Sequence, residues 1–577
     1  MTVGDLQEPE DERDEISFPE ANIAGIRHIT GTVQSTLGPT PRDKLLVSTG
    51  DDTSVVSDAP DYEVTSDGAT ILELLPLEHP IAEIARDIAG PRRPGETDID
   101  GEDIPDGVTT TLVFANALLR EAQALLDKGL HPRTVTRGYD KARTCAREAV
   151  DDLRRSVSEY SGDGLHACAR TSITGNDIGG KADTWARFAV DAVRTVGAPD
   201  ERTLAVRQTS DGAIDDSRLV KGAVLDANSV VDFRMPRSVE EATVLAIGGY
   251  ERGGLRDPEI GDRYVATPES AADVDAFRDL FGDNRAEIIS EIRSTGADVV
   301  VTRLGITPEY QAMLADLGIV GIRNVSRLDL RQVCAATGAS LVKDPEDFAT
   351  ADLGHAGHVT EQTVGSRRDE TGSSEMVLFE GCDDPDAVAV LLRGVTDRWG
   401  ELATTQIRKA ANAAAIAAGE TTLPAGVVPG GGATHMAVSR RIGSRSAGEK
   451  SRERLALTAF TNALTRVVGT LASNCGLNPI DTVTTLRQRH TGGETTTGIA
   501  APPGRIDDVW QQGVLDPAGL REQQYHKATE VANLVLRIDD SLDATFSEVP
   551  DSPDDSIHPA AAERHEDYRA ENETRWD

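Results

Sequence analysis

Four short loops carry the residue types that bind phosphate groups. They are the segments 36–39 (TLGP), 66–70 (SDGAT), 106–111 (DGVTTT) and 429–433 (PGGGA). Glycines expose backbone N–H groups, threonine hydroxyls add donors, and an aspartate can hold Mg²⁺. Segment 106–111 also runs into an apolar helix pattern, whose N-terminus favours anions. Each loop offers what a nucleoside triphosphate needs, although any one of them is more often a turn or a helix cap.

A fifth loop, GNDIGGKA at 175–182, has the spacing of a P-loop up to its last position. Ala182 has no hydroxyl to hold Mg²⁺, and the residues before Gly175 do not form a convincing buried strand. We therefore expect an ordinary surface turn here.

The apolar pattern divides the chain into helical ends and a mixed middle. Helical spacing marks three segments near the two ends of the chain: 111–128, 452–472 and 523–536. In the middle, short β-rich runs at 296–305 and 376–381 alternate with helix patterns. The sequence predicts a multidomain α+β protein in which an α/β domain is inserted into a helical one.

Composition excludes several classes of partner. The 577 residues suggest several domains, and 59 Lys+Arg against 97 Asp+Glu leave a net charge of −38. Such a field repels phosphate backbones and anionic lipid, so neither nucleic acid nor a membrane surface is an expected partner. The composition is rich in carboxylates and contains only nine lysines, and in this it resembles the surfaces of proteins from salt-loving organisms. The acidic segments 1–16 and 541–577 are expected to be disordered tails.

Location and redox state follow from the same composition. No apolar run approaches the ~18 residues of a membrane span. The N-terminus is acidic where a signal peptide would be basic, so a cytoplasmic protein is expected. The five cysteines show no C-x-x-C spacing and fit reduced core thiols.

The order of the loops and their neighbours resembles the group II chaperonins, the thermosome (TCP-1/cpn60) family of archaea and its eukaryotic cytosolic relatives. Near the N-terminus the resemblance is carried by VQSTLGPTPRDKLLV (33–47), VTSDGATILELLPLEHP (64–80) and DGVTTTLVFANALLREAQALLDKGLHP (106–132). Near the C-terminus it is carried by VVPGGGATHMAVSRR (427–441), NCGLNPIDTVTTLRQRH (474–490) and GVLDPAGLREQQYHKATEVANLVLRIDD (513–540). The middle of the chain agrees more loosely.

The resemblance implies a subunit of three domains in a double ring around a cavity. The implied boundaries are 1–152 and 411–577 for a helical equatorial domain, 153–220 and 366–410 for an α/β intermediate hinge, and 221–365 for an α/β apical domain. A helical protrusion at about 255–295 would close the cavity as a lid. Its apolar stripe, Val274, Phe277, Leu280 and Phe281, would contact unfolded proteins or pack on its own domain.

The resemblance also implies a site for Mg-ATP. The implied binding residues are Thr36, Leu37, Gly38, Pro39, Gly107, Val108, Thr109, Thr110, Gly431, Gly498, Ile499 and Asp516. Gly498 and Ile499 look like the adenine wall, and Asp516 looks like the carboxylate that binds the ribose. Asp106 would hold Mg²⁺ on the phosphates, and Asp67 would lie near the water that attacks the γ-phosphate.

Three departures from the family pattern affect hydrolysis. Thr40 and Pro41 replace a lysine and a glycine, and Val108 replaces a threonine. The aspartate that should reach the γ-phosphate falls on Lys409 when counted forward from residues 391–394, or on Ala413 when counted back from the triple glycine. Lysine cannot orient water as a carboxylate does. We expect the protein to bind nucleotide and to hydrolyse it slowly or not at all. If positioning of the attacking water is worth ~10²–10³ in rate, its loss raises the activation barrier by roughly 3–4 kcal/mol.

Two functions remain in view. The first is a chaperonin subunit that cycles with ATP and encloses unfolded proteins, beside identical or sister subunits. The second is a structural or scaffold subunit that keeps the ring surfaces without ATP hydrolysis. For Lys409 itself the alternative is a solvated helix residue with no catalytic consequence. A metabolic enzyme is poorly supported, because no Ser-His-Asp set can be placed and no H-E-x-x-H motif occurs.

Overall fold

The protein is seen in a computed structural model that describes residues 18–47, 62–75, 77, 79–90, 107–175, 180–226, 230–249, 253–256, 285–343, 348, 353–364, 374–395, 397–502 and 504–538. The elements that position the site lie within one compact unit, Glu20–Arg537. The predictions for Asp106, for segments 1–16 and 541–577, and for most of the protrusion, including its apolar stripe, lie outside the described residues.

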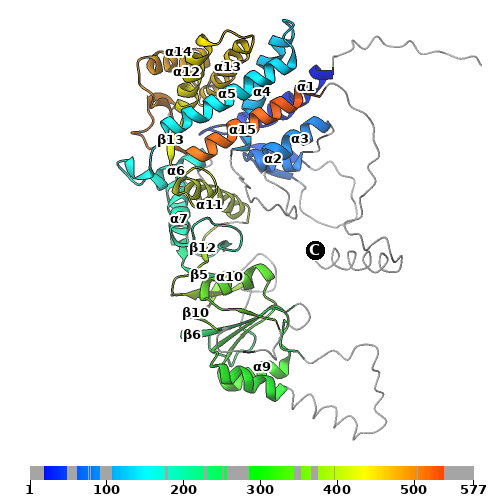
Figure 1. Ribbon diagram of the computed structural model, residues 1–577. Coiled ribbons are helices and arrows are strands. Elements are labelled where there is room, and N and C mark those ends of the chain that lie inside the picture. Colours follow the sequence, from blue (N-terminus) through cyan, green and yellow to red (C-terminus); the bar gives the residue numbers. More distant parts are fainter. Residues whose placement is uncertain are drawn as a thin grey trace, which may run out of the picture. The chain divides into compact units, whose positions relative to one another are not determined.

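A bundle of long helices forms the first core. Its members are α4 (Val108–Leu126), α5 (Pro132–Leu153), α12 (Ala433–Gly448), α13 (Glu453–Asn474) and α15 (Ala518–Val535), which contact one another and lie side by side in Figure 1. Phe460 of α13 meets Phe114 edge to face at 5.2 Å between ring centroids. Gly138 lets α5 approach α13, because a Cβ there would lie 2.3 Å from Ala456 Cβ. Close packing of aromatic and small residues therefore fixes the bundle.

Helix α13 has the length and apolar composition of a membrane span, as no other described helix does, but 56% of that stretch is buried inside the protein. Contacts with α4, α5 and α12 account for this burial. Its composition is that of a core helix.

Short elements surround the bundle and end at the predicted loops. They are α1 (Phe18–Val33), α2 (Gly68–Leu74), α3 (Pro80–Ala89), α14 (Pro479–Thr491) and three antiparallel pairs, β1 (Lys44–Val47) with β2 (Tyr62–Thr65), β13 (Val427–Pro429) with β16 (Leu515–Pro517), and β14 (Thr497–Ala500) with β15 (Arg505–Asp508). The β13–β16 pair opposes Val428 to Asp516. The triple-glycine turn after β13 is thereby fixed beside Asp516.

A three-stranded sheet joins outgoing and returning parts of the chain. Its order is β3 (Leu204–Gln208), β12 (Val388–Leu392) and β4 (Arg218–Val220), with β12 parallel to β3 and antiparallel to β4. One core unites its strands with α6 (Gly164–Ile173), α7 (Ala182–Val196) and α11 (Asp397–Ala418), around the buried Trp185. Helix α11 leaves this core to reach the loops of the helical bundle.

The largest sheet is mixed. Its order is β5 (Gly222–Leu225), β11 (Ser374–Glu380), β10 (Gly354–Val364), β6 (Ser238–Ile247), β7 (Val299–Thr302) and β8 (Val320–Ile322), with β9 (Leu341–Val342) also on β6. Strands β6, β7, β8 and β9 pair in parallel, and β7 is buried at every position. Helices α9 (Pro308–Leu317), α10 (Arg327–Thr337) and the helical residues 285–295 add to its core. A strand buried on both faces needs such cover.

The α+β class predicted from the sequence is confirmed. The expected helices at 111–128 and 452–472 correspond to α4 and α13, and the strand runs at 296–305 and 376–381 contain β7 and most of β11. Helix α15 differs, because it begins at Ala518, five residues before the predicted start at 523. Pro517 precedes it with φ −62°, a value suited to helix entry. The five cysteines form no disulfide.

The domain boundaries remain a prediction. Helix α11 runs unbroken through the boundary predicted between residues 410 and 411. A hinge there would have to move this helix as a rigid rod.

Candidate functional site

One cavity of about 450 Å³ brings together the loops singled out in the sequence. Among the described residues predicted for the site, its wall includes all but Gly498: Thr36, Leu37, Gly38, Pro39, Asp67, Gly107, Val108, Thr109, Thr110, Lys409, Gly431, Ile499 and Asp516. The volume falls within the ~300–1,000 Å³ of small-molecule sites. These loops lie far apart in the sequence, so the cavity is a product of the tertiary fold.

Glycines allow the first three loops to meet at the start of α4. A Cβ on Gly68 would lie 2.0 Å from Thr109 Oγ1, and one on Gly38, which has φ +97°, would lie 2.4 Å from Leu471 Cδ1. The hydroxyls of Thr36 and Thr109 are 3.3 Å apart and share a hydrogen bond. A larger residue at Gly68 would press on the Thr109 side chain at the start of α4, and one at Gly38 would displace the tip of Leu471 on α13.

Two helix N-termini open at the cavity. Helix α4 follows Gly107 (φ +86°) and α12 follows Gly432 (φ +80°), and a glycine has no side chain with which to cap its helix. By contrast, Asp67 caps α2, which starts beside them. The first turn of a helix presents N–H groups and the positive end of the helix dipole, which attract an anion.

The opposite wall is built of backbone. Gly431 has φ +56°, and a Cβ there would lie 2.3 Å from the carbonyl oxygen of Ile499, whose N–H donates to Gly431 O at 2.8 Å. Gly498 does not line the cavity, since its Cα packs behind Gly431, with an added Cβ 2.9 Å from Gly431 O. Gly498 therefore supports the wall, and Ile499 faces the cavity.

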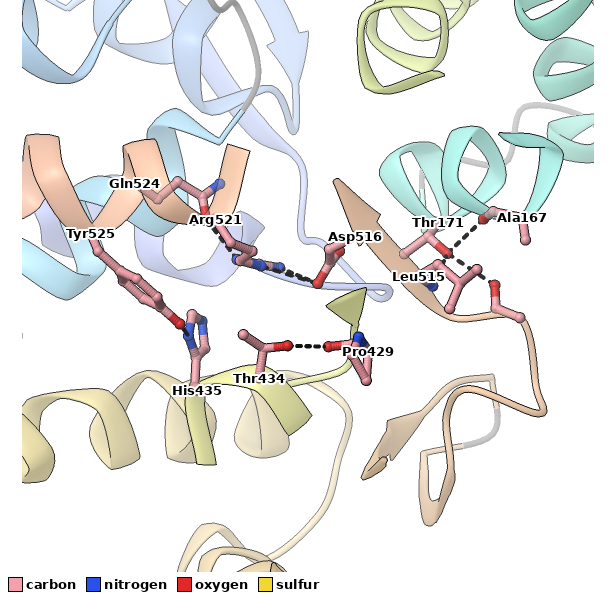
Figure 2. A network of polar contacts seen from close by, with 11 residues as sticks. Ala167, Thr171, Pro429, Thr434, His435, Leu515, Asp516, Arg521, Gln524 and Tyr525 are labelled. Carbon is pink, nitrogen blue, oxygen red and sulfur yellow. Dashed lines mark hydrogen bonds and ion pairs between the residues drawn. The ribbon is translucent and has the colours of Figure 1, made fainter. Parts of the chain in front are cut away.

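Asp516 carries an ion pair that the sequence did not predict. Arg521 Nε and Nη2 both donate to Asp516 Oδ2, at 3.1 and 2.6 Å, while Nη1 donates to Gln524 Oε1 at 2.7 Å. Figure 2 shows these three side chains beside the β13–β16 pair. The Asp516 and Arg521 side chains are only 14% and 16% exposed.

Thr171 fixes the strand that carries Asp516. Its hydroxyl donates to Ala167 O at 2.9 Å and to Gly513 O at 3.3 Å, and it accepts from Leu515 N at 3.1 Å. Figure 2 shows Thr171, from α6, against Leu515 of β16. The contact holds β16 against a neighbouring helix.

Behind this wall lies a buried His–Tyr pair. His435 Nδ1 and Tyr525 Oη are 2.5 Å apart. Burial, with a smaller effect from the positive charge of Arg521, lowers the pKa of His435 well below 6.5. Burial also raises the pKa of Tyr525 far above its usual value. Both side chains are therefore neutral near pH 7.

Buried His435 should make stability depend on pH. The unfolded chain takes up a proton below pH 6.5 and the folded histidine resists it, so its contribution is complete above pH 6.5 and is lost as the pH falls toward the lowered pKa. The slope is about 1.4 kcal/mol per pH unit. We expect the difference in melting temperature between wild type and His435→Gln to shrink from pH 7.5 to 5. A constant difference for His435→Gln would contradict the assignment.

Lys409 forms an ion pair with Asp67 inside the cavity. Lys409 Nζ, from α11, contacts Asp67 Oδ1, and Thr70 N and Oγ1 donate to Asp67 Oδ2 at 3.1 and 2.9 Å. Burial alone would raise the pKa of Asp67, but the charge of Lys409 and the hydrogen bonds from Lys409 and Thr70 outweigh it and hold that pKa below its usual value. Ala413, the other position considered, is fully buried and does not line the cavity.

The residues that depart from the family pattern, and the lysine of the P-loop-like segment, also have defined positions. Val108 and Pro41 line the cavity, and Thr40 Oγ1 donates to Asn474 O at 2.6 Å. Lys181, the lysine of the P-loop-like segment, pairs with Asp215. That lysine therefore binds a carboxylate outside the cavity.

Sequence reasoning missed Arg521, Gln524 and His435, all of which line the cavity. Because the last helix was predicted to start at residue 523, Arg521 was expected in a loop. In a loop, its spacing from Asp516 does not predict a contact between the two side chains. The signal was Pro517 as a helix start, because positions 521 and 524 then share one face of α15.

A helical bundle with a loop-lined cavity, together with an inserted α/β sheet, is the architecture expected of a group II chaperonin subunit. Comparison with known proteins agrees, since the model of the TCP-1/cpn60 chaperonin family matches residues 29–545. The chain belongs to the TCP-1/cpn60 chaperonin family, and within it to the group II chaperonin subunits.

Several curated relatives cover nearly the whole chain. A thermosome subunit of Methanopyrus kandleri is 33% identical over 91% of this chain and 91% of its own length. Thermosome subunit beta of Aeropyrum pernix is 34% identical over 90% and 91%, and thermosome subunit 1 of Haloferax volcanii is 33% identical over 91% and 88%. The relationship therefore extends across the full architecture.

Proposed function

We propose that this chaperonin subunit binds Mg-ATP in the cavity at the start of α4. The observation that carries the proposal is the convergence of residues 36–39, Asp67, 107–110, Gly431 and Asp516 on one space of about 450 Å³. The first turns of α4 and α12 would donate N–H groups to the phosphates. Ile499 would pack on the base, and Asp516 would accept from the ribose.

The proposal includes a magnesium ion on the phosphates. Asp106 directly precedes Gly107 in the sequence and would hold the ion with a carboxylate oxygen, the donor that Mg²⁺ prefers. When bound, Mg²⁺ neutralises charge on the phosphates. Gly107, Thr109 and Thr110 would hold the phosphate oxygens next to it.

We further propose that hydrolysis is slow. Asp67 already bonds Lys409 through Oδ1 and Thr70 through Oδ2, so it has little capacity left to orient a water. Lys409 is a cation and cannot accept the proton of that water. This ion pair favours the second candidate function, a ring subunit that binds nucleotide without turning it over at a useful rate.

The assembly would be a cytoplasmic double ring of identical or sister subunits that takes up unfolded proteins. The intermediate segments 153–220 and 366–410 would act as the hinge, and α11 would transmit the nucleotide state because Lys409 lies on it. Ligand binding would then shift an equilibrium between open and closed subunits.

Calorimetry and size measurements test the proposal together. We expect purified protein to bind Mg-ATP with a Kd in the micromolar range and to hydrolyse it roughly 10²-fold more slowly than a typical thermosome. A ring would elute near ~1 MDa, and an isolated subunit near 61.5 kDa. If calorimetry detects no heat of binding, the proposal of a nucleotide site is wrong. If the protein hydrolyses ATP at the rate of ordinary thermosomes, the proposal of slow hydrolysis is wrong.

A further inference from the structure

The first turns of α15 connect the two ends of the cavity. Arg521, Gln524 and Tyr525 follow at helical spacing and lie on one face. Arg521 bonds Asp516 at the β13–β16 end and Gln524 on its own helix. Gln524 Nε2 lies over Gly107, 2.1 Å from where a Cβ would stand. Arg521 thus bonds the strand carboxylate directly and also bonds Gln524, the residue that lies against Gly107 at the start of α4. Figure 2 shows Arg521 between Asp516 and Gln524.

The ion pair is asymmetric at Asp516. Both donors of Arg521 end on Oδ2, and no described residue bonds Oδ1. Pairing of Val428 with Asp516 fixes the backbone, and the two bonds from the guanidinium fix the side chain. The second carboxylate oxygen is thereby held in one orientation at a cavity wall, with the carboxylate charge balanced by the adjacent cation.

We propose that Arg521 is the positioning residue that makes Asp516 selective for the ribose hydroxyls, and hence makes the site prefer ribonucleotides. The inference rests on the nucleotide binding proposed above. A fixed carboxylate whose other oxygen is already bonded gains most from a hydroxyl donor. It rejects a sugar that lacks one, because the oxygen that the sugar then covers is left unbonded.

The experiment compares the affinities of Mg-ATP and Mg-2′,3′-dideoxy-ATP within each variant by calorimetry. Wild type should bind ATP about tenfold or more tightly than the dideoxy analogue. Arg521→Met, which keeps the bulk and removes the donors, should bring this ratio close to one. Arg521→Lys, which keeps the charge and one donor group, should restore part of the preference. Because both ligands are measured on the same sample, a partly unfolded fraction lowers the number of sites and leaves the ratio unchanged.

Two controls complete the design. Asp516→Asn should also reduce the ratio, because it weakens the acceptor itself, and Arg537→Met, at an exposed position just after the same helix, should keep the wild-type ratio. A wild-type ratio in Arg521→Met would overturn the role of Arg521 and leave nucleotide binding intact. Failure of the wild type to bind ATP would instead overturn the proposed function, and this inference with it.

Discussion

Lys409→Asp should raise ATP hydrolysis by about 10²-fold, which corresponds to roughly 2.7 kcal/mol of the barrier. The substitution removes the cation that holds Asp67 Oδ1 and supplies a carboxylate on α11 at the cavity wall. Two carboxylates could then orient water where a single neutralised one stands in the wild type. Steady-state phosphate release under saturating Mg-ATP measures the effect.

Two further variants separate charge removal from carboxylate supply. Lys409→Met leaves Asp67 buried without its cation and should lower stability by about 3 kcal/mol. Because it frees Asp67 Oδ1 but supplies no second carboxylate, it should raise hydrolysis less than Lys409→Asp does. Lys181→Asp breaks a more exposed ion pair, with Asp215 outside the cavity, and should leave hydrolysis unchanged. If Lys409→Asp hydrolyses ATP no faster than Lys409→Met, the assignment of this position to the catalytic step is wrong.

Gly431→Ala should reduce ATP affinity by at least ~10²-fold. The new Cβ would lie 2.3 Å from the carbonyl oxygen of Ile499, and a backbone atom cannot rotate away as a side-chain tip can. The backbone conformation at φ +56° also costs alanine roughly 1–2 kcal/mol of conformational strain. The turn after β13 must then move from β14, which opens the wall between Gly431 and Ile499. Calorimetric titration with Mg-ATP reports the loss.

The matched control is Gly443→Ala in the following helix, α12. An added Cβ there meets nothing within 4 Å, so this variant should bind ATP normally and be more stable by roughly 0.5–1 kcal/mol. Normal binding by Gly431→Ala would show that the triple-glycine turn does not form part of the nucleotide site.

Much of the fold could be predicted from local patterns. Apolar residues at helical spacing identified α4 and α13. Each helix buries a wide face, and the apolar residues that form this face recur every three or four positions in the sequence. The β-rich run that contains β7 was equally clear. A strand buried on both faces has apolar residues at consecutive positions, here three valines in a row. The start of α15 was not, because Arg521 and Gln524 are polar residues whose burial depends on partners from other parts of the chain.

The sequence by itself determined which loops carry glycine, threonine and aspartate, and it located the lysine on α11 where a carboxylate was expected. Those are properties of residue type and order. Only the tertiary structure decided that Lys409 pairs with Asp67 while Ala413 is packed in a core, and that Arg521 bonds Asp516. Ion pairs between residues far apart in sequence depend on the distance and direction of their side chains, and packing of helices and strands sets both.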